Sequence, residues 1–119
     1  MSIIADPIAT YSRSTPHRIA VGDAETGAMM DWRTLDLAIN RAANWLIGKF
    51  GPKSGARIAT LTRNDPLMLI LQFACIRSGA IFVPYNWRLA TAEIEALMAD
   101  ATPVFLFHDP DFTLPDYAC

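Results

Sequence analysis

The sequence has little of several features that mark particular classes of protein. Its 119 residues hold no block of basic or acidic side chains, and the formal net charge is only −2. This balance gives no electrostatic reason to expect nucleic acid or an anionic membrane as a partner. The longest apolar stretch, residues 67–76, is interrupted by Gln72 and is too short to span a bilayer. The N-terminus lacks a basic start followed by an apolar run, so we expect no signal peptide.

Cysteine is also scarce. Cys75 lies within an apolar helical pattern and Cys119 is the last residue. A disulfide between them is one interpretation. Two free thiols in a reducing, cytoplasmic compartment is the simpler one, and we favour it.

No pattern of metal ligands or catalytic residues stands out. His108 beside Asp109 could suggest a base or a metal ligand, but one such pair is far short of a zinc site and no nucleophile accompanies it. The acidic residues Asp109, Asp111 and Asp116 lack the tight spacing and glycine turn of a calcium loop. We therefore expect no metal site and no catalytic residue here.

What the sequence does have is a high hydrophobic content, 52%, and clear periodic patterns. Residues 3–12 predict a short amphipathic helix, and the apolar runs 19–21 and 28–30 predict a β-hairpin around the loop "GDAETG". Asp31 is a plausible N-cap for the clearest helix of the chain, 32–50. The apolar face expected for that helix is formed by Trp32, Leu35, Ile39, Ala42, Leu46 and Phe50.

The second half alternates strands and helices. The expected elements are a strand at 57–61, a helix at 65–78 opened by Asp65 and Pro66 and closed by Gly79, a strand at 81–83, a helix from Thr91 to about 100 capped by Thr91, and a strand at 103–107. This order predicts an α/β fold with a parallel, or mostly parallel, sheet and crossover helices, preceded by a helix and a short hairpin. We expect one partial domain over 1–119, with 109–119 as an irregular tail.

The loops that follow the first two strands of this sheet carry polar side chains. Ligands of open parallel sheets bind beyond the carboxyl ends of the strands. The candidate binding residues there are Arg63, Asn64, Asn86, Trp87 and Arg88. An arginine beside a helix N-terminus can hold a phosphate or a carboxylate through paired N–H donors. The alternative is that the asparagines fix the loop backbone and the arginines form surface ion pairs; the role of Trp87 stays open.

An ordered series of segments carries a resemblance to a known family. The segments are "TPHRIAV", "MDWRTLDLAINRAANWL", "GARIATLTRNDP", "CIRSGAIFVPYNWRLATAEIEALMADA" and "PVFLF". Together, over roughly residues 3–108, they resemble the start of the AMP-dependent synthetases and ligases, the adenylate-forming enzymes that include acyl-CoA synthetases, aryl-CoA ligases and luciferases. The sharpest part is Gly-Ala-x-x-x-Pro at 79–84 followed by Asn-x-Arg-Leu at 86–89.

The resemblance implies a two-step reaction. A carboxylic acid attacks the α-phosphate of ATP to give an acyl-adenylate and pyrophosphate, and the thiol of CoA then displaces AMP. It also implies that Arg88 touches a phosphate of the CoA nucleotide while Asn86 shapes the loop. ATP, magnesium and CoA would serve the full-length enzyme, with a small carboxylic acid as its substrate.

The sequence also departs from the family pattern. The Gly- and Ser/Thr-rich phosphate loop ending in Pro-Lys-Gly, the Tyr-Gly-x-Thr-Glu segment, the ribose-binding Asp and the lid lysine are absent from these 119 residues. We therefore expect an N-terminal portion of a longer ligase that is inactive by itself and binds no cofactor alone. Its nearly all-apolar helix at 66–78 predicts self-association of the isolated chain. The alternative is a stand-alone flavodoxin-like module that binds a ligand or a partner without catalysis.

Overall fold

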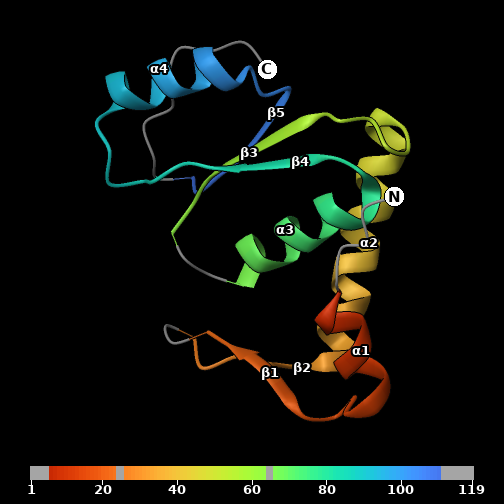
Figure 1. Cartoon of the computed structure of the whole chain (residues 1–119). Coiled ribbons are helices and arrows are strands. Elements are labelled where there is room, and N and C mark those ends of the chain that lie inside the picture. The colour runs from red at the N-terminus through yellow and green to blue at the C-terminus, as the bar shows by residue number, and fades with distance from the viewer. Residues whose placement is uncertain (1–5, 24–25, 64–65, 111–119) are drawn as a thin grey trace.

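The computed structural model describes residues 6–23, 26–63 and 66–110, and its elements form an N-terminal helix and hairpin followed by a layered α/β unit (Figure 1). The first helix, α1 (Pro7–Ser14), is capped by Asp6, whose Oδ1 accepts a hydrogen bond from the Ala9 N–H at 3.1 Å. It extends two residues past the predicted end at Ser12, and the Thr15 N–H closes its last turn by donating to the Tyr11 carbonyl at 2.8 Å. Residues 3–5 of that prediction lie outside the described residues.

The predicted hairpin is confirmed as an antiparallel pair, β1 (Ile19–Gly22) and β2 (Met29–Asp31). The chain passes directly from β2 into α2 (Trp32–Phe50). Asp31 is the N-cap, as expected, and its Oδ1 accepts from the Thr34 N–H at 2.7 Å. The helix ends at Gly51, where the backbone has a φ of 89° that favours glycine.

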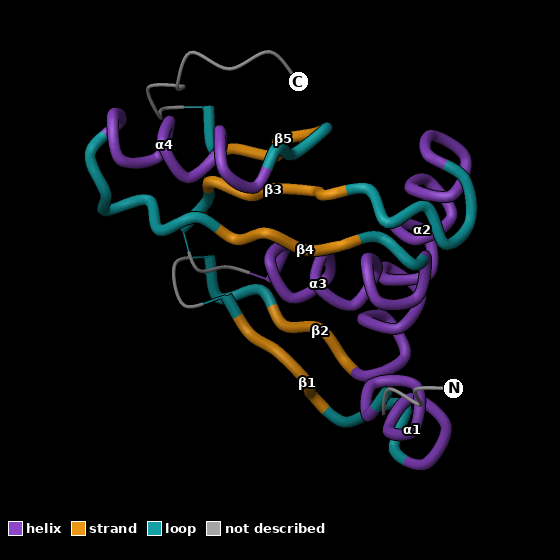
Figure 2. The backbone as a smooth tube through the Cα atoms, turned by 45° about the horizontal axis from the view of Figure 1, so that its top comes forward, coloured by secondary structure: helices purple, strands orange, loops and turns teal. Residues whose placement is uncertain are grey.

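The remaining elements are β3 (Arg57–Leu61), α3 (Pro66–Ser78), β4 (Ile81–Pro84), α4 (Thr91–Ala101) and β5 (Phe105–His108). Both β4 and β5 pair in parallel with β3, so the strand order is β4-β3-β5 and the predicted parallel sheet is confirmed. The chain moves from β3 to β4 in one direction and then returns across β3 to reach β5. Crossover connections between parallel strands are right-handed, so two crossovers that run in opposite directions along the sheet have their helices on opposite faces. Figure 2 shows this arrangement for α3 and α4.

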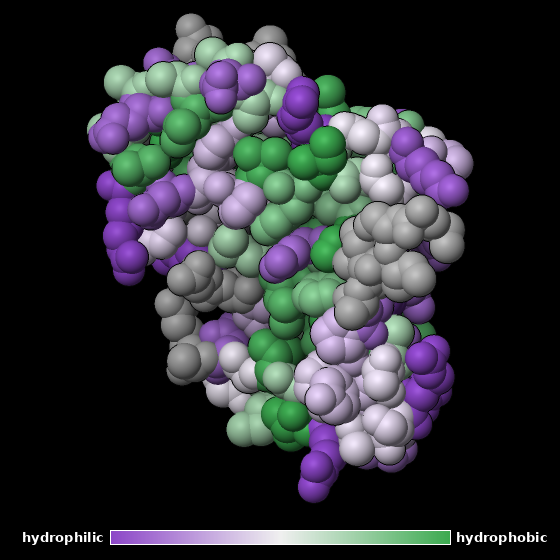
Figure 3. Space-filling model, viewed as in Figure 1, coloured by the Kyte–Doolittle hydropathy of each residue, from purple (hydrophilic) through white to green (hydrophobic). Residues whose placement is uncertain are grey.

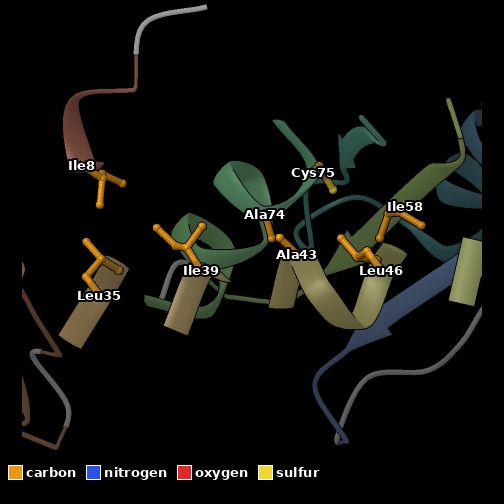
Figure 4. Close-up of a cluster of buried hydrophobic side chains, with 8 residues drawn as sticks. All are labelled: Ile8, Leu35, Ile39, Ala43, Leu46, Ile58, Ala74 and Cys75. Carbon is orange, nitrogen blue, oxygen red and sulfur yellow. The ribbon is translucent and has the colours of Figure 1, made fainter. Parts of the chain in front are cut away.

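Each face of the sheet has its own apolar core. The larger core runs along α2, from α1 past α3 to the sheet (Figure 4), and its buried side chains are Ile8, Leu35, Ile39, Ala43, Leu46, Ile58, Ala74 and Cys75. The smaller core lies under α4 and is formed by Ala59, Leu61, Tyr85, Ile94 and Met98. Adjacent residues of β3 therefore point into different cores, as the two-residue period of a strand requires.

The start of α4 differs from the prediction. The N-cap is Ala90, not Thr91, and Thr91 is the first helical residue. Ala90 has no side-chain acceptor, and the Glu93 carboxylate supplies the capping contact by accepting from the Ala90 N–H at 3.3 Å. The last strand also begins later than expected, at Phe105 rather than at Pro103, which is buried ahead of it.

Within the described residues, no helix combines the length and the apolar character needed to cross a membrane.

Candidate functional site at the carboxyl edge of the sheet

The reversal in strand order identifies one edge of the sheet as the place for a site. The helices that follow the neighbouring strands β3 and β4 leave toward opposite faces (Figures 1 and 2). In open α/β sheets, the crevice between two such loops is the usual ligand position. Here the two loops are those that begin at Thr62 and at Tyr85, and they carry the residues that the sequence singled out.

The loop after β3 is tied to the end of β5. The Arg63 N–H donates to Asp109 Oδ2 at 2.9 Å, and the Arg63 guanidinium lies 3.5 Å from the same oxygen. The Asp109 N–H in turn donates to the Leu61 carbonyl at 3.3 Å. Arg63 is therefore partly neutralised by a carboxylate that also fixes its backbone.

The loop after β4 is held by its own side chains. The Tyr85 N–H continues the sheet by donating to the Thr60 carbonyl at 2.9 Å, and the Tyr85 ring is buried in the smaller core. Asn86 Oδ1 accepts from the Arg88 N–H at 3.0 Å, which is the local turn that a short amide side chain favours. Asn86 thus fixes the backbone from which Arg88 projects.

Trp87 brings the two loops together. The guanidinium carbon of Arg88 lies 4.9 Å from the centre of a Trp87 ring, and that of Arg63 lies 5.3 Å from it. Both distances are within the range of a cation–π interaction. Two arginines from different loops therefore share one indole at the carboxyl edge.

The two arginines differ in their electrostatic setting. Arg63 has Asp109 beside it, whereas the Arg88 side chain is exposed and has no carboxylate within ion-pair distance in the described part of the chain. The group of Arg63, Asp109 and Arg88 thus carries one excess positive charge, on Arg88. This arrangement can bind a phosphate or another anion.

Two buried hydroxyls complete the edge. Thr60 and Thr62 are 0% and 2% exposed, and their Oγ1 atoms have no hydrogen-bond partner among the described residues. Since they are two residues apart on β3 and its extension, they share the face that Ile58 presents to the larger core.

The structure thus brings together Arg63, Asn86, Trp87 and Arg88, whereas Asn64 lies outside the described residues. Sequence reasoning missed Asp109 as part of this edge and assigned it to an irregular tail. No local signal could have paired it with Arg63, because the two are 46 positions apart. His108 Nδ1 contacts the adjacent Asp109 carbonyl at 2.9 Å, and no group of three potential metal ligands occurs in the described ranges.

Comparisons with known proteins give a consistent result. A family model described as "AMP-binding enzyme" matches residues 8–117. Feruloyl-CoA synthase of an Amycolatopsis species is 36% identical over 100 residues, which are 84% of this chain and 20% of that protein. Indoleacetate–CoA ligase of Aromatoleum aromaticum is 51% identical over 55 residues, 46% of this chain and 11% of that protein.

Solved structures agree with the sequence relatives. The O-succinylbenzoate coenzyme A synthetase of Bacillus subtilis, solved in complex with AMP, superposes with a TM-score of 0.79 at 27% identity, covering 91% of this chain and 28% of that one. The N-terminal subdomain of NpsA from Klebsiella oxytoca has a TM-score of 0.82 at 22% identity, covering 93% of this chain and 27% of that one, which is a likeness of fold. The chain thus spans about a fifth of the length of the feruloyl-CoA synthase and somewhat over a quarter of these structures.

Proposed function

The chain belongs to the family of AMP-binding enzymes, and from this membership we propose that its residues serve an ATP-dependent ligase that joins a carboxylic acid to CoA. In such a reaction, a carboxylate oxygen attacks the α-phosphate of ATP and pyrophosphate leaves. The CoA sulfur then attacks the acyl carbon, and AMP leaves. The names of the related proteins, which include feruloyl-CoA synthase and indoleacetate–CoA ligase, support an acid–CoA ligase as the class.

Within that reaction we assign this chain a binding role at its carboxyl edge. The observation that carries the assignment is the setting of Arg88: an exposed guanidinium without a carboxylate partner among the described residues, on a backbone fixed by Asn86. A phosphate of the CoA nucleotide is the dianion that it would meet. Arg63 is a weaker candidate for the same contact, because Asp109 already compensates its charge.

ATP and magnesium are assigned to other parts of the ligase. The sequence has no Gly- and Ser/Thr-rich phosphate loop ending in Pro-Lys-Gly. The structure offers no cluster of metal ligands among the residues that it describes. We therefore infer that the 119 residues alone form no acyl-adenylate. The buried thiol of Cys75, which is free, is compatible with a reducing cytoplasm as the site of action.

The role of Arg88 is tested by the variant Arg88→Ala in the native protein. Loss of one charge-assisted contact corresponds to about 1.5 to 3 kcal/mol, so the KM for CoA should rise roughly ten- to hundredfold. Acid-dependent ATP–pyrophosphate exchange, which reports the first step alone, should not change. Arg41→Ala is the matched control, because it removes the same charge from an exposed position on α2. An unchanged dependence on CoA would rule out the role.

The proposed inactivity of the chain alone has its own measurement. The purified 119-residue chain, supplied with ATP, magnesium and a panel of aryl and fatty acids, should show no acid-dependent ATP–pyrophosphate exchange. Exchange above background would contradict the proposal. If the native protein also lacks exchange with every acid, a binding module without catalysis becomes the better account.

A further inference from the structure

We propose that Trp87 is a positioning residue that holds the Arg88 guanidinium in the orientation in which it meets a phosphate of the thiol substrate. This inference rests on the proposed function and extends it from the binding residue to the group that supports it.

The Arg88 side chain is long and exposed. Asn86 fixes the backbone N–H of Arg88, but it does not touch the guanidinium, which is separated from that backbone by several rotatable bonds. A long exposed side chain loses considerable rotamer entropy when it is ordered. The Trp87 ring, 4.9 Å from the guanidinium carbon, is the one partner of that group in the described part of the chain. The indole therefore restricts Arg88 before any anion arrives.

The Trp87 indole is itself held in place by its surroundings. Trp87 is only partly exposed and packs against the smaller core under α4. Its ring also lies 5.3 Å from the Arg63 guanidinium, and Arg63 is anchored to Asp109 through both its backbone N–H and its side chain. The ring is thus supported by elements from the ends of β3 and β5, while Arg88 comes from the loop after β4.

Arg88 supplies the charge and Trp87 supplies the position of that charge. Asp109 balances Arg63, so the anion is attracted by Arg88 and not by the pair of arginines together. Replacing Trp87 leaves the positive charge of Arg88 unchanged but removes the ring that the guanidinium contacts. A replacement that keeps an aromatic ring preserves much of the interaction, since cation–π attraction requires the ring face rather than the indole nitrogen.

The experiment measures kcat and KM in the native protein with two thiols, CoA and pantetheine, the second of which carries no phosphate. Trp87→Leu should raise the KM for CoA about two- to fivefold, the range expected for an exposed cation–π contact. It should leave kcat and the KM for pantetheine unchanged. Trp87→Phe should restore most of the affinity for CoA.

A double variant provides the sharpest criterion. If Trp87 acts through Arg88, then Trp87→Leu combined with Arg88→Ala should have the same KM for CoA as Arg88→Ala alone. Trp45→Leu is the matched control, because Trp45 is another partly exposed tryptophan, which packs edge-to-face against Phe105 and Phe107 away from these loops. It should leave both KM values unchanged.

The outcomes distinguish the inference from the proposed function. If Arg88→Ala leaves the KM for CoA unchanged, the role proposed for Arg88 is wrong and the inference falls with it. If Arg88→Ala raises it but Trp87→Leu does not, only the positioning role is overturned. Effects of the two changes that multiply, or a rise in the KM for pantetheine, would also overturn it, since Trp87 would then contact the ligand itself or maintain the loop as a whole.

Discussion

Gly79 illustrates how one backbone position constrains this fold. It ends α3 with a φ of 78°, a conformation that residues with a Cβ adopt at a cost. Its backbone also lies against the Lys53 segment, where the Gly55 N–H donates to the Gly79 carbonyl at 2.9 Å. A Cβ added at Gly79 would come within 2.4 Å of Lys53 Cα. Both the turn and the close approach therefore require glycine.

We expect Gly79→Ala to lower the free energy of unfolding by about 2 to 4 kcal/mol, from backbone strain and steric overlap together. Urea unfolding followed by circular dichroism measures the change. Gly55→Ala is the matched control, because Gly55 has a similar φ of 65° but open space around its Cβ position. Gly55→Ala should lower the free energy of unfolding only by the cost of backbone strain, about 1 to 2 kcal/mol. Equal losses at the two positions would show that the contact with Lys53 is unimportant.

Arg63 and Arg88 show which features of the site could be predicted from the sequence and which could not. Each follows a strand of the sheet, and their positions at the carboxyl edge follow from the alternation of strands and helices. Only Arg63 has its charge compensated, by Asp109. Asp109 lies close to Arg63 because β5 pairs with β3. That contact depends on the strand order, and local patterns do not determine strand order. The contact of Arg63 with Trp87 depends in the same way on the pairing of β3 with β4, whereas Arg88 is next to Trp87 in the sequence.

The helices α1, α2 and α3 are joined by a single polar cluster around Arg77. Its Nε donates to Asp6 Oδ2 at 2.8 Å, its Nη2 to Asp36 Oδ1 at 2.7 Å, and its Nη1 to Asn40 Oδ1 at 2.8 Å. Burial opposes the charge on Arg77, but the hydrogen bonds to the two aspartates nevertheless raise its pKa. The hydrogen bond from Arg77 lowers the pKa of Asp6 below its usual value of 3.8. The cluster therefore fixes α1 to the helical layer through charged groups.

The pH dependence of this cluster follows from the direction of the Asp6 shift. A carboxyl whose pKa is lower in the folded state stabilises the fold above its unfolded pKa, and this contribution is lost as the pH falls through the folded value. We expect Asp6→Asn to cost about 1 kcal/mol at pH 7. The difference from the unchanged protein should begin to shrink near pH 3.8 and vanish only as the pH falls through the lower pKa of the folded state. Thermal unfolding at a series of pH values measures it.

The control for this cluster is Asp100→Asn, an exposed position on α4, which should have little effect at any pH. A cost of Asp6→Asn that stays constant down to low pH would show that the carboxylate charge does not contribute.

Elements whose ends carry a clear N-cap or a glycine were predicted well. The N-cap Asp31 and the glycines at 51 and 79 located the ends of α2 and α3 correctly. The start of α4 was misplaced, because the capping carboxylate comes from Glu93 inside the helix rather than from the residue before it. In α2, Ala43 is buried in the larger core beside Ala74 of α3, whereas Ala42, which was expected on the apolar face, is only partly buried.

Considered as one body, the chain leaves much apolar surface outside its two cores. Figure 3 shows apolar residues across the middle of one face, from the sheet toward the hairpin. Large apolar side chains that are at least two-fifths exposed are Tyr11 47%, Ile19 59%, Met29 72%, Leu37 44%, Trp45 45%, Leu67 41%, Ile81 45%, Leu97 44% and Val104 46%. The helix α3 itself is better covered than its composition suggested, because α2 packs along it and only Leu67 of its large apolar residues reaches this level of exposure. The exposed apolar surface is therefore spread over several elements.

We expect the isolated 119-residue chain to self-associate at micromolar concentration, because exposed apolar groups in this number favour contact between copies. Sedimentation velocity over a range of concentrations measures the association, and binding of a hydrophobic dye reports the surface independently. Met29→Lys places a charge at the most exposed of these positions and should reduce the association, whereas Thr26→Lys adds the same charge at an exposed polar position of the hairpin and should change it little. A chain that stays monomeric at every concentration and binds no dye would show that its exposed apolar side chains do not cause association. That result would favour the alternative of a stand-alone binding module.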